Sequence, residues 1–283
     1  SYQTQTSSTP NNTRDASAKI ERYTQIQVNG TLNYKDTFKD KHNLDVMVGS
    51  EYFGYNEFMM EAKTQNSPTD DIPTLNAGAT RTSTTSEKTG YRIASVFGRI
   101  NYNYQMKYLL SLVARYDGIS RLKDNRWGFF PGVSVGWRVS EEKFWKENVS
   151  WMDYLKVRAS WGQMGNDKVD AFQYLTAYTF DNPAILGGGI ESGLWLLRTA
   201  NPNITWEVAN TYNVGIETRF LKYFNFEADF FKTKRNNILA TRNAAIPEYA
   251  GLTLPDENIG ICSNIGTELT LGFSKQLNKD WSI

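Results

Sequence analysis

Long stretches of this chain alternate apolar and polar residues at every second position, and no other feature constrains its fold so strongly. From 26 to 34 the even positions are apolar or glycine, namely Ile26, Val28, Gly30, Leu32 and Tyr34, whereas the odd positions from 25 to 35 are all polar. Successive side chains of a strand point to opposite faces, so such a stretch has one apolar and one polar face. The same alternation recurs over 155–162 and 206–220. It predicts strands that lie between an apolar and a watery environment.

Nine such strands are expected, and many exceed the five or six residues that are usual in globular proteins. They cover roughly 20–35, 43–55, 91–105, 108–117, 127–139, 155–164, 204–220, 224–235 and 259–275, and a tenth begins near 281. Their lengths suit tilted strands that cross a bilayer. Helical periodicity is limited to the short stretch 140–153. The chain has no apolar run of about 18 residues, so no transmembrane helix is predicted.

The connections between these strands alternate in length. Those expected to be short or compact are 36–42, 106–107, 140–154, 221–223 and 276–280, and those expected to be longer are 56–90, 118–126, 165–203 and 236–258. Outer-membrane barrels combine tight periplasmic turns with long extracellular loops in this way. The alternation therefore predicts that the long connections are extracellular.

Aromatic residues on the apolar face gather near both ends of the expected strands. Rings at these places form the two interfacial girdles of a membrane barrel. The expected girdle comprises Tyr34, Tyr102, Tyr104, Tyr108, Trp137, Phe220, Phe224 and Phe273 near the tight turns, with Tyr52, Tyr116, Trp161 and Trp206 toward the opposite ends. The competing interpretation is that aromatic residues are simply common in strands.

The opposite face of the strands is strongly polar. Its members include Asp45, Glu51, Arg99, Asn101, Arg115, Asp117, Arg138, Lys156, Arg158, Glu217, Asp229 and Glu268. A small closed barrel fills its interior with side chains, whereas a wide barrel has a wet lumen. The predicted fold is therefore all-β, a transmembrane antiparallel β-barrel of which the chain supplies nine or ten strands. Neither end looks like a natural terminus, and we expect an internal piece of a longer protein.

Composition excludes several classes of function. A net charge of +1, from 31 Lys+Arg and 30 Asp+Glu, argues against a nucleic-acid partner. One cysteine, Cys262, and one histidine, His42, leave no basis for a disulfide or for a Cys or His metal site. His42 falls in a tight turn without a nucleophile, and the pair Asp70–Asp71 is expected to be a solvated loop rather than a calcium site. No cofactor and no catalytic residue are predicted.

Specific motifs then resemble one family. The runs are 97–104 (FGRINYNY) with 107–110 (KYLL), 115–121 (RYDGISR), 126–131 (RWGFFP), 133–142 (VSVGWRVSEE), 155–162 (LKVRASWG) with 165–166, 201–207 (NPNITWE), 212–215 (YNVG) and 264–269 (NIGTEL). In this order they resemble the SusC/RagA-like TonB-dependent transporters. The chain departs from the family pattern at Trp161, where Tyr is usual, at Ile265, where Arg is favoured, and at Thr267, where a small apolar residue is favoured.

The resemblance implies a 22-stranded barrel in the outer membrane of a Gram-negative bacterium, with residues 1–283 forming part of one barrel domain. The plug, the TonB box and the N-terminal extension have no counterpart in these residues. It further implies active import of oligosaccharides or peptides, a SusD-like surface lipoprotein as partner, and energy from the TonB–ExbB–ExbD complex. Two alternatives stay open: a passive outer-membrane porin, and a barrel-type outer-membrane enzyme, for which the sequence offers no His or Ser constellation.

Connection 165–203 contains the candidate binding residues. Its length of about 39 residues and its large rings point to function rather than disorder. The candidates for contact with a substrate or a lid are Phe172, Tyr174, Tyr178, Trp195 and Arg198. The competing interpretation is that these rings are buried against neighbouring loops.

The two-faced strands also predict how the chain tolerates charge. Arginine at Val28, Val214 or Leu271 should impair assembly, because these residues would face lipid. Arginine at Gln27, Glu217 or Thr270 should be tolerated, because these residues would face the lumen.

Overall fold

The computed structural model describes residues 14–69, 71–72, 74–180, 184–187, 189–241, 254–275 and 281. Two compact units are distinguished along the chain. Unit 1 comprises Ser1–Val28 and Tyr52–Arg92, and unit 2 comprises Asn29–Glu51 and Ile93–Ile283.

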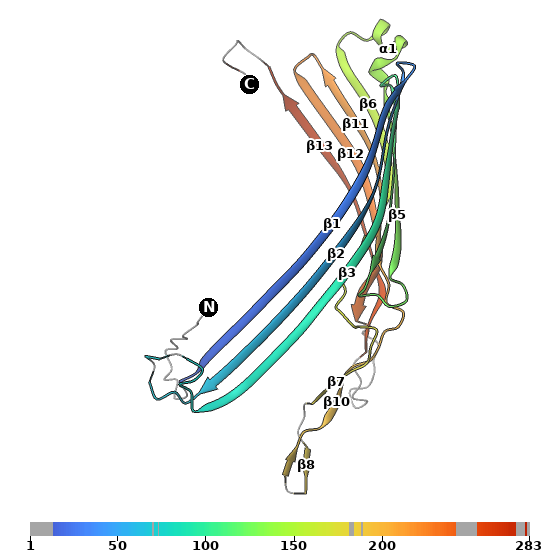
Figure 1. Cartoon of the computed structure of the whole chain (residues 1–283). Coiled ribbons are helices and arrows are strands. Elements are labelled where there is room, and N and C mark those ends of the chain that lie inside the picture. The colour runs from blue at the N-terminus through green and yellow to red at the C-terminus, as the bar shows by residue number, and fades with distance from the viewer. Residues whose placement is uncertain are drawn as a thin grey trace. The chain divides into compact units, whose positions relative to one another are not determined.

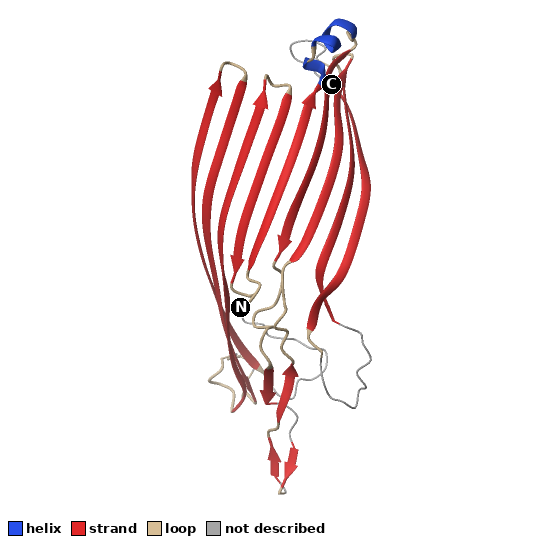
Figure 2. Ribbon diagram, turned by 90° about the vertical axis from the view of Figure 1, so that its right-hand side faces the viewer, coloured by secondary structure: helices blue, strands red, loops and turns tan. Residues whose placement is uncertain are grey.

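The main sheet is antiparallel, and strands that are neighbours in it mostly follow one another in the chain. Sheet order is β1-β2-β3-β4-β5-β6-β11-β12-β13, and Figures 1 and 2 show the short turns, such as those from β3 to β4 and from β11 to β12, at the end that carries α1. The strands are β1 (Ala16–Phe38), β2 (His42–Gln65), β3 (Thr80–Tyr104), β4 (Tyr108–Ile119), β5 (Trp127–Arg138), β6 (Met152–Asn166), β11 (Glu207–Phe220), β12 (Phe224–Thr241) and β13 (Asp256–Phe273). The expectation of an antiparallel meander of long strands is confirmed.

Cross-strand register assigns the side chains of unit 2 to the two faces that the alternation predicts. Val214 of β11 is opposite Ala159 of β6 and Phe230 of β12, which places an apolar row on one face. Glu217 is opposite Lys156 on the other face. Large apolar side chains of the first face are exposed, Val214 to 53%. A row of exposed valines and phenylalanines on a paired sheet suits contact with lipid rather than water.

The first three strands differ most from their predicted bounds. Strand β2 continues to Gln65 and β3 begins at Thr80, so the expected long loop 56–90 is wrong and the connection covers only 66–79. The regular alternation of apolar and polar residues is lost in the added parts of these strands, but backbone pairing does not require it. Residues 80–90 are rich in threonine, whose branched side chain favours strands.

Within unit 1, side chains tie β2 to β3. Arg92 donates from Nη1 to the carbonyl oxygen of Tyr55 at 2.9 Å and from Nη2 to Oδ1 of Asn56 at 3.0 Å. The rings of Tyr55 and Tyr91 lie 5.4 Å apart. These contacts stabilise the hairpin where it no longer alternates apolar and polar residues.

The remaining elements are short. The compact segment after β5 contains a 3-10 helix, Val139–Glu141, and α1, Lys143–Asn148. Between β6 and β11 lie four small strands, β7 (Ala177–Phe180), β8 (Ala184–Leu186), β9 (Gly189–Glu191) and β10 (Leu194–Arg198). They form two two-stranded antiparallel sheets, β7 with β10 and β8 with β9, and β8 and β9 lie between β7 and β10 in the chain. Among the described residues, no helix has the length and apolarity that a membrane span requires.

Candidate functional site

An ion-pair cluster crosses β6, β11 and β12 on the charged face of unit 2. Nζ of Lys156 lies 3.1 Å from Oε1 of Glu217, and Nε of Arg158 lies 3.0 Å from the same oxygen. Arg158 also reaches across β11, with Nη2 2.6 Å from Oδ2 of Asp229. Gly215 of β11 makes this reach possible, because a Cβ there would lie 2.5 Å from Oδ1 of Asp229.

The position of Glu217 in this cluster corrects one expectation. An arginine at 217 was expected to be tolerated on the lumenal face, but Glu217 is the shared partner of Lys156 and Arg158. Replacing it by arginine would bring three cations together in a partly buried place. Like charges opposite one another in a sheet destabilise it, so we expect Glu217→Arg to be damaging and Thr270→Arg to be the valid lumenal control.

A second cluster on the same face surrounds Arg115 of β4. Its Nε lies 2.7 Å from Oδ1 of Asp117, and its Nη2 lies 3.2 Å from Oε2 of Glu51 and 2.9 Å from Oγ of Ser95. Its guanidinium carbon lies 5.3 Å from the centre of the Phe97 ring. Arg115 is thus paired with one carboxylate on its own strand and with a second on β2.

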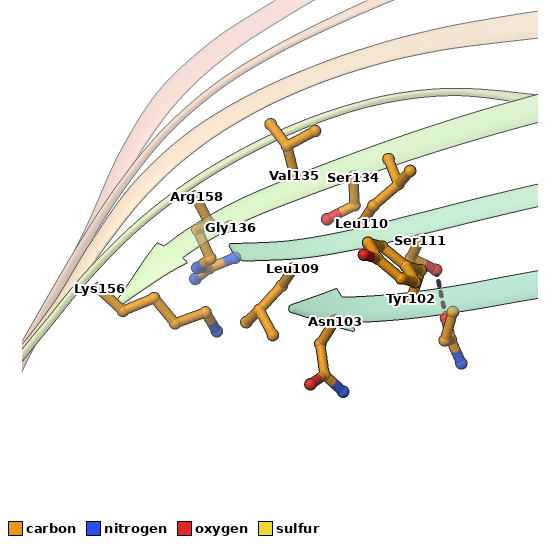
Figure 3. A pocket seen from close by; sticks show the side chains of 11 residues that line it. Tyr102, Asn103, Leu109, Leu110, Ser111, Ser134, Val135, Gly136, Lys156 and Arg158 are labelled. Atoms are coloured by element: carbon orange, nitrogen blue, oxygen red, sulfur yellow. Dashed lines mark hydrogen bonds between the residues drawn. The ribbon is translucent and has the colours of Figure 1, made fainter. Parts of the chain in front are cut away.

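A shallow hollow of about 260 Å³ lies beside the first cluster on the lumenal face. Figure 3 shows Lys156 and Arg158 of β6 together with Leu109 and Ser111 of β4 around it. Ser111 donates its hydroxyl to Oδ1 of Asn101 at 2.7 Å, which fixes one side of the hollow. The wall therefore offers cationic, amide and hydroxyl groups to a polar ligand or to a protein segment in the lumen.

Asparagine side chains fasten the end of unit 2 that is opposite to the tight turns. Oδ1 of Asn258 accepts a hydrogen bond from the Thr205 amide at 2.9 Å, and its Nδ2 donates to the carbonyl oxygens of Thr205 at 3.0 Å and Asn237 at 2.8 Å. Asn125 donates to the carbonyl oxygen of Ile204, which is almost fully buried. We call these five residues the clasp. The sequence analysis used the run 201–207 only as a family motif and missed this structural role.

Trp206 comes directly after the clasp residues Ile204 and Thr205, and it does not lie in the girdle as expected. It is only 8% exposed, its Nε1 donates to the carbonyl oxygen of Arg126 at 3.2 Å, and its ring meets the Phe130 ring edge-on at 5.3 Å. Trp206 also precedes β11, which begins at Glu207 rather than at 204. A buried indole with a satisfied N–H has a packing role, so the girdle assignment does not hold for this residue.

The structure brings three of the five candidate binding residues together. Phe172 and Tyr174 have ring centres 6.2 Å apart, and Nη2 of Arg198 donates to the carbonyl oxygen of Phe172 at 2.9 Å. Arg198 ends β10, so this hydrogen bond joins the small hairpin to the preceding turn. The Arg198 guanidinium therefore binds a backbone carbonyl within its own segment. The ring of Phe172 is exposed.

The hairpin of β7 and β10 presents an apolar face to the surroundings. Phe180 is opposite Leu194 and Tyr178 is opposite Leu196, and residues two apart on a strand share a face. Tyr178 is 60% exposed, Phe180 79% and Leu194 62%. We call Tyr178, Phe180, Leu194 and Leu196 the hairpin face.

Trp195, the fifth candidate, pairs through its backbone with Thr179. Its side chain lies outside the part of the chain that the structure describes, as does Asp70.

Most of the expected girdle residues other than Trp206 lie near strand ends, but Tyr52 lies in the middle of β2, which continues to Gln65, and Trp161 lies inside β6. At the tight-turn end Phe220 stacks on Phe224 with centres 5.4 Å apart, and Phe224 lies 5.1 Å from Phe273. Tyr104 and Tyr108 are stacked at 6.4 Å. Tyr34, Tyr102, Trp137 and Trp161 also lie on the strands where they were expected. His42 is part of this end, with Nδ1 2.8 Å from the Tyr102 hydroxyl.

Glu142 connects the girdle to the compact turn after β5. It accepts hydrogen bonds from the Tyr108 hydroxyl at 2.7 Å, from Nζ of Lys107 at 3.0 Å and from Nε1 of Trp137 at 3.3 Å. The bonds from Tyr108 and Lys107 hold the pKa of the Glu142 carboxyl below its ordinary value. Rings with the apolar body toward lipid and the polar tip toward such a partner are typical of a membrane interface.

Two aromatic residues of the opposite girdle were not singled out from the sequence. Trp127 stacks on Tyr116 with centres 5.0 Å apart and planes 10° from parallel, and Phe129 is opposite Tyr116 in the register. The family motif at 126–131 contains both residues, and their odd positions on β5 could have identified them as outward-facing.

Comparisons with known proteins agree with this architecture. A family model described as TonB dependent receptor-like, beta-barrel matches residues 1–281. TonB-dependent receptor P26 of Formosa agariphila is 32% identical over 246 residues, covering 85% of this chain and 24% of that protein. TonB-dependent receptor SusC of Bacteroides thetaiotaomicron is 30% identical over 260 residues, covering 85% of this chain and 24% of that protein.

Among solved structures, that of the RagAB peptide transporter superposes with a TM-score of 0.82 at 24% identity, covering 94% of this chain and 29% of that one. This likeness shows the fold. The chain spans about a quarter of the length of the curated relatives it matches. A long antiparallel sheet with one lipid-facing side, one charged lumenal side and aromatic rings at its strand ends is thus part of a Gram-negative outer-membrane barrel, and the chain belongs to the TonB-dependent receptor-like β-barrel family.

Proposed function

We propose that the protein containing this chain imports oligosaccharides or peptides across the outer membrane by TonB-dependent transport, together with a SusD-like surface lipoprotein. The observation that carries the proposal is family membership over residues 1–281. Energy would come from the inner-membrane TonB–ExbB–ExbD complex, and the parts of the transporter that meet it lie outside these residues.

The charged lumenal wall supports passage of a polar solute rather than a packed interior. Lys156, Arg158, Glu217 and Asp229 neutralise one another in pairs, so the wall is hydrophilic without a large field of one sign. A wall of this kind lets a neutral sugar or a peptide exchange hydrogen bonds with amide and hydroxyl groups. A strongly charged wall would instead select ions.

We further propose that the segment between β6 and β11 contacts the substrate or the lipoprotein lid through Phe172, Tyr174 and the hairpin face. Exposed rings supply a large contact area at small entropic cost and dominate binding hot spots. Trp195 and Arg198 belong to the same segment, with Arg198 holding it in shape through Phe172. The clasp fixes the return of this segment into β11.

The test uses the full-length transporter in cells that express its lipoprotein. Tyr178→Ala with Phe180→Ala removes two rings of the hairpin face, and Thr179→Ala on the opposite face is the matched control. Uptake of labelled substrate should fall roughly thirtyfold for the double variant, if each ring contributes about 1 kcal/mol, and should stay at the parental level for the control. Deletion of residues 172–198 should abolish uptake while the barrel stays folded in the membrane.

Two results would contradict these proposals separately. Full uptake by the deletion variant would mean that this segment does not hold the substrate or lid, while import itself could stand. Full uptake in cells without TonB would exclude active import and favour a passive channel.

A further inference from the structure

Two lysines stand on the outward face of β12. The register places Lys232 opposite Tyr212 and Lys234 opposite Asn210, on the same face as Phe230 and Val214. Both lysines are exposed. They therefore share the side of the sheet that is otherwise apolar.

These lysines are distinctive among the outward positions that the register defines. The paired outward positions are the even residues 94–104 of β3, 108–118 of β4, 208–220 of β11 and 224–236 of β12, and the odd residues 127–137 of β5, 155–163 of β6 and 263–273 of β13. Within this described set, Lys232 and Lys234 are the charged residues.

The height of the pair on the barrel explains how lipid-facing lysines are tolerated. Phe224 begins β12 at the tight turn, and Lys234 lies ten residues further along. At about 3.3 Å per residue and a tilt of about 40°, that is roughly 25 Å above the turn, close to the height of the apolar band of outer-membrane barrels. The ammonium groups therefore reach the headgroup level of the leaflet next to the long connections, which is the outer leaflet.

Neither lysine is neutralised by the described part of the protein. No carboxylate of the described residues lies within ion-pair distance of Lys232 or Lys234, whereas the neighbouring Arg235, on the lumenal side, has Nη1 3.2 Å from Oε1 of Glu207. Two adjacent cations at headgroup level have complementary charge to phosphate groups of the lipid. Close by on the same face, Nε2 of Gln163 donates to Oδ1 of Asn210 at 2.8 Å, so amide groups border the pair.

We propose that Lys232 and Lys234 form a binding site for the phosphate groups of lipopolysaccharide, the phosphorylated glycolipid of the outer leaflet. The two side chains lie about 7 Å apart along the strand, and their flexible stems let both ammonium groups approach one phosphate or two neighbouring ones. The site rests on the family and the orientation of the barrel, and it does not depend on which solute is imported.

The test measures lipid binding to the full-length transporter purified in detergent. The probes are diphosphorylated lipid A, the same lipid with its phosphates removed, and inorganic phosphate. The variant is Lys232→Gln with Lys234→Gln, the charge-preserving variant is Lys232→Arg with Lys234→Arg, and the matched control is Lys222→Gln in the tight turn at the other end of the barrel. Folding of each variant is checked by its heat-dependent electrophoretic mobility.

Anionic lipid attracts a nearby lysine by about 1 kcal/mol, so the double glutamine variant should bind phosphorylated lipid A roughly thirtyfold more weakly. The arginine variant and Lys222→Gln should bind as the parent does. Unchanged binding by a folded glutamine variant would overturn the proposal. So would equal affinity of the parent for the dephosphorylated lipid, or an affinity for inorganic phosphate as high as for the lipid.

Discussion

Placing a charge on the lipid-facing side of β11 is the most direct test of the two-faced sheet. Val214 lies six residues from Phe220, which begins the tight turn. At about 3.3 Å per residue and a tilt of about 40°, Val214 is roughly 15 Å above the turn and close to the bilayer midplane. Its neighbours are Ala159 and Phe230, which offer no partner for a charge. Val214→Arg should therefore lower the free energy of unfolding by about 2–4 kcal/mol.

Thr270→Arg on β13 is the lumenal control. Thr270 is exposed on the charged face and is opposite Glu227, so an arginine there gains an ion-pair partner worth about 0.2–1 kcal/mol. The measurement is urea-induced unfolding of the full-length transporter in lipid vesicles, followed by tryptophan fluorescence. The two variants should differ by roughly thirtyfold or more in their unfolding equilibrium constants. Equal destabilisation by both would refute the assignment of faces.

Three further outcomes follow from the described contacts. Arg158→Leu leaves Glu217 and Asp229 without their shared cation and should cost about 2 kcal/mol in the same unfolding measurement, with Arg158→Lys losing less. Because hydrogen bonds lower the pKa of Glu142, its stabilisation is present above the ordinary glutamate pKa of about 4.3 and is lost as the pH falls through the lowered value. The parent should therefore lose stability in acid by a component that Glu142→Gln lacks, as thermal unfolding at stepped pH will reveal. Asn258→Ala removes three hydrogen bonds of the clasp and should speed proteolytic cleavage within 167–205 severalfold; an unchanged cleavage rate would show that the clasp does not hold this segment.

The faces of the strands could be predicted from the sequence because lipid imposes its pattern directly on the residues. The apolar side chain of Val214 and the charged side chain of Glu217 each indicate by themselves which face of β11 they occupy. The tight turns at 106–107 and 221–223 were likewise visible, since the alternation breaks there for only a few residues. These features needed no knowledge of which strands pair.

Other features depend on contacts between distant parts of the chain and could not be predicted in this way. The role of Glu217 emerges only when β11 is placed beside β6 in register. The burial of Trp206 depends on Phe130, far away in sequence. Strands β2 and β3 continue into residues that show no regular alternation, and β7–β10 are too short to show any period.

The ion pair between Arg158 and Asp229 connects two strands of the sheet that are not direct neighbours. The two residues belong to β6 and β12, and β11 lies between these strands. Their ion pair passes over Gly215 of β11. Any other residue there would place a Cβ against the side chains of Arg158 and Asp229. The ion pair requires all three strands to be in register, so a slip of any one of them would break it. A contact of this kind ties three strands into one cooperative unit, so loss of the Arg158–Asp229 ion pair reports a change in that unit rather than the opening of a single hairpin.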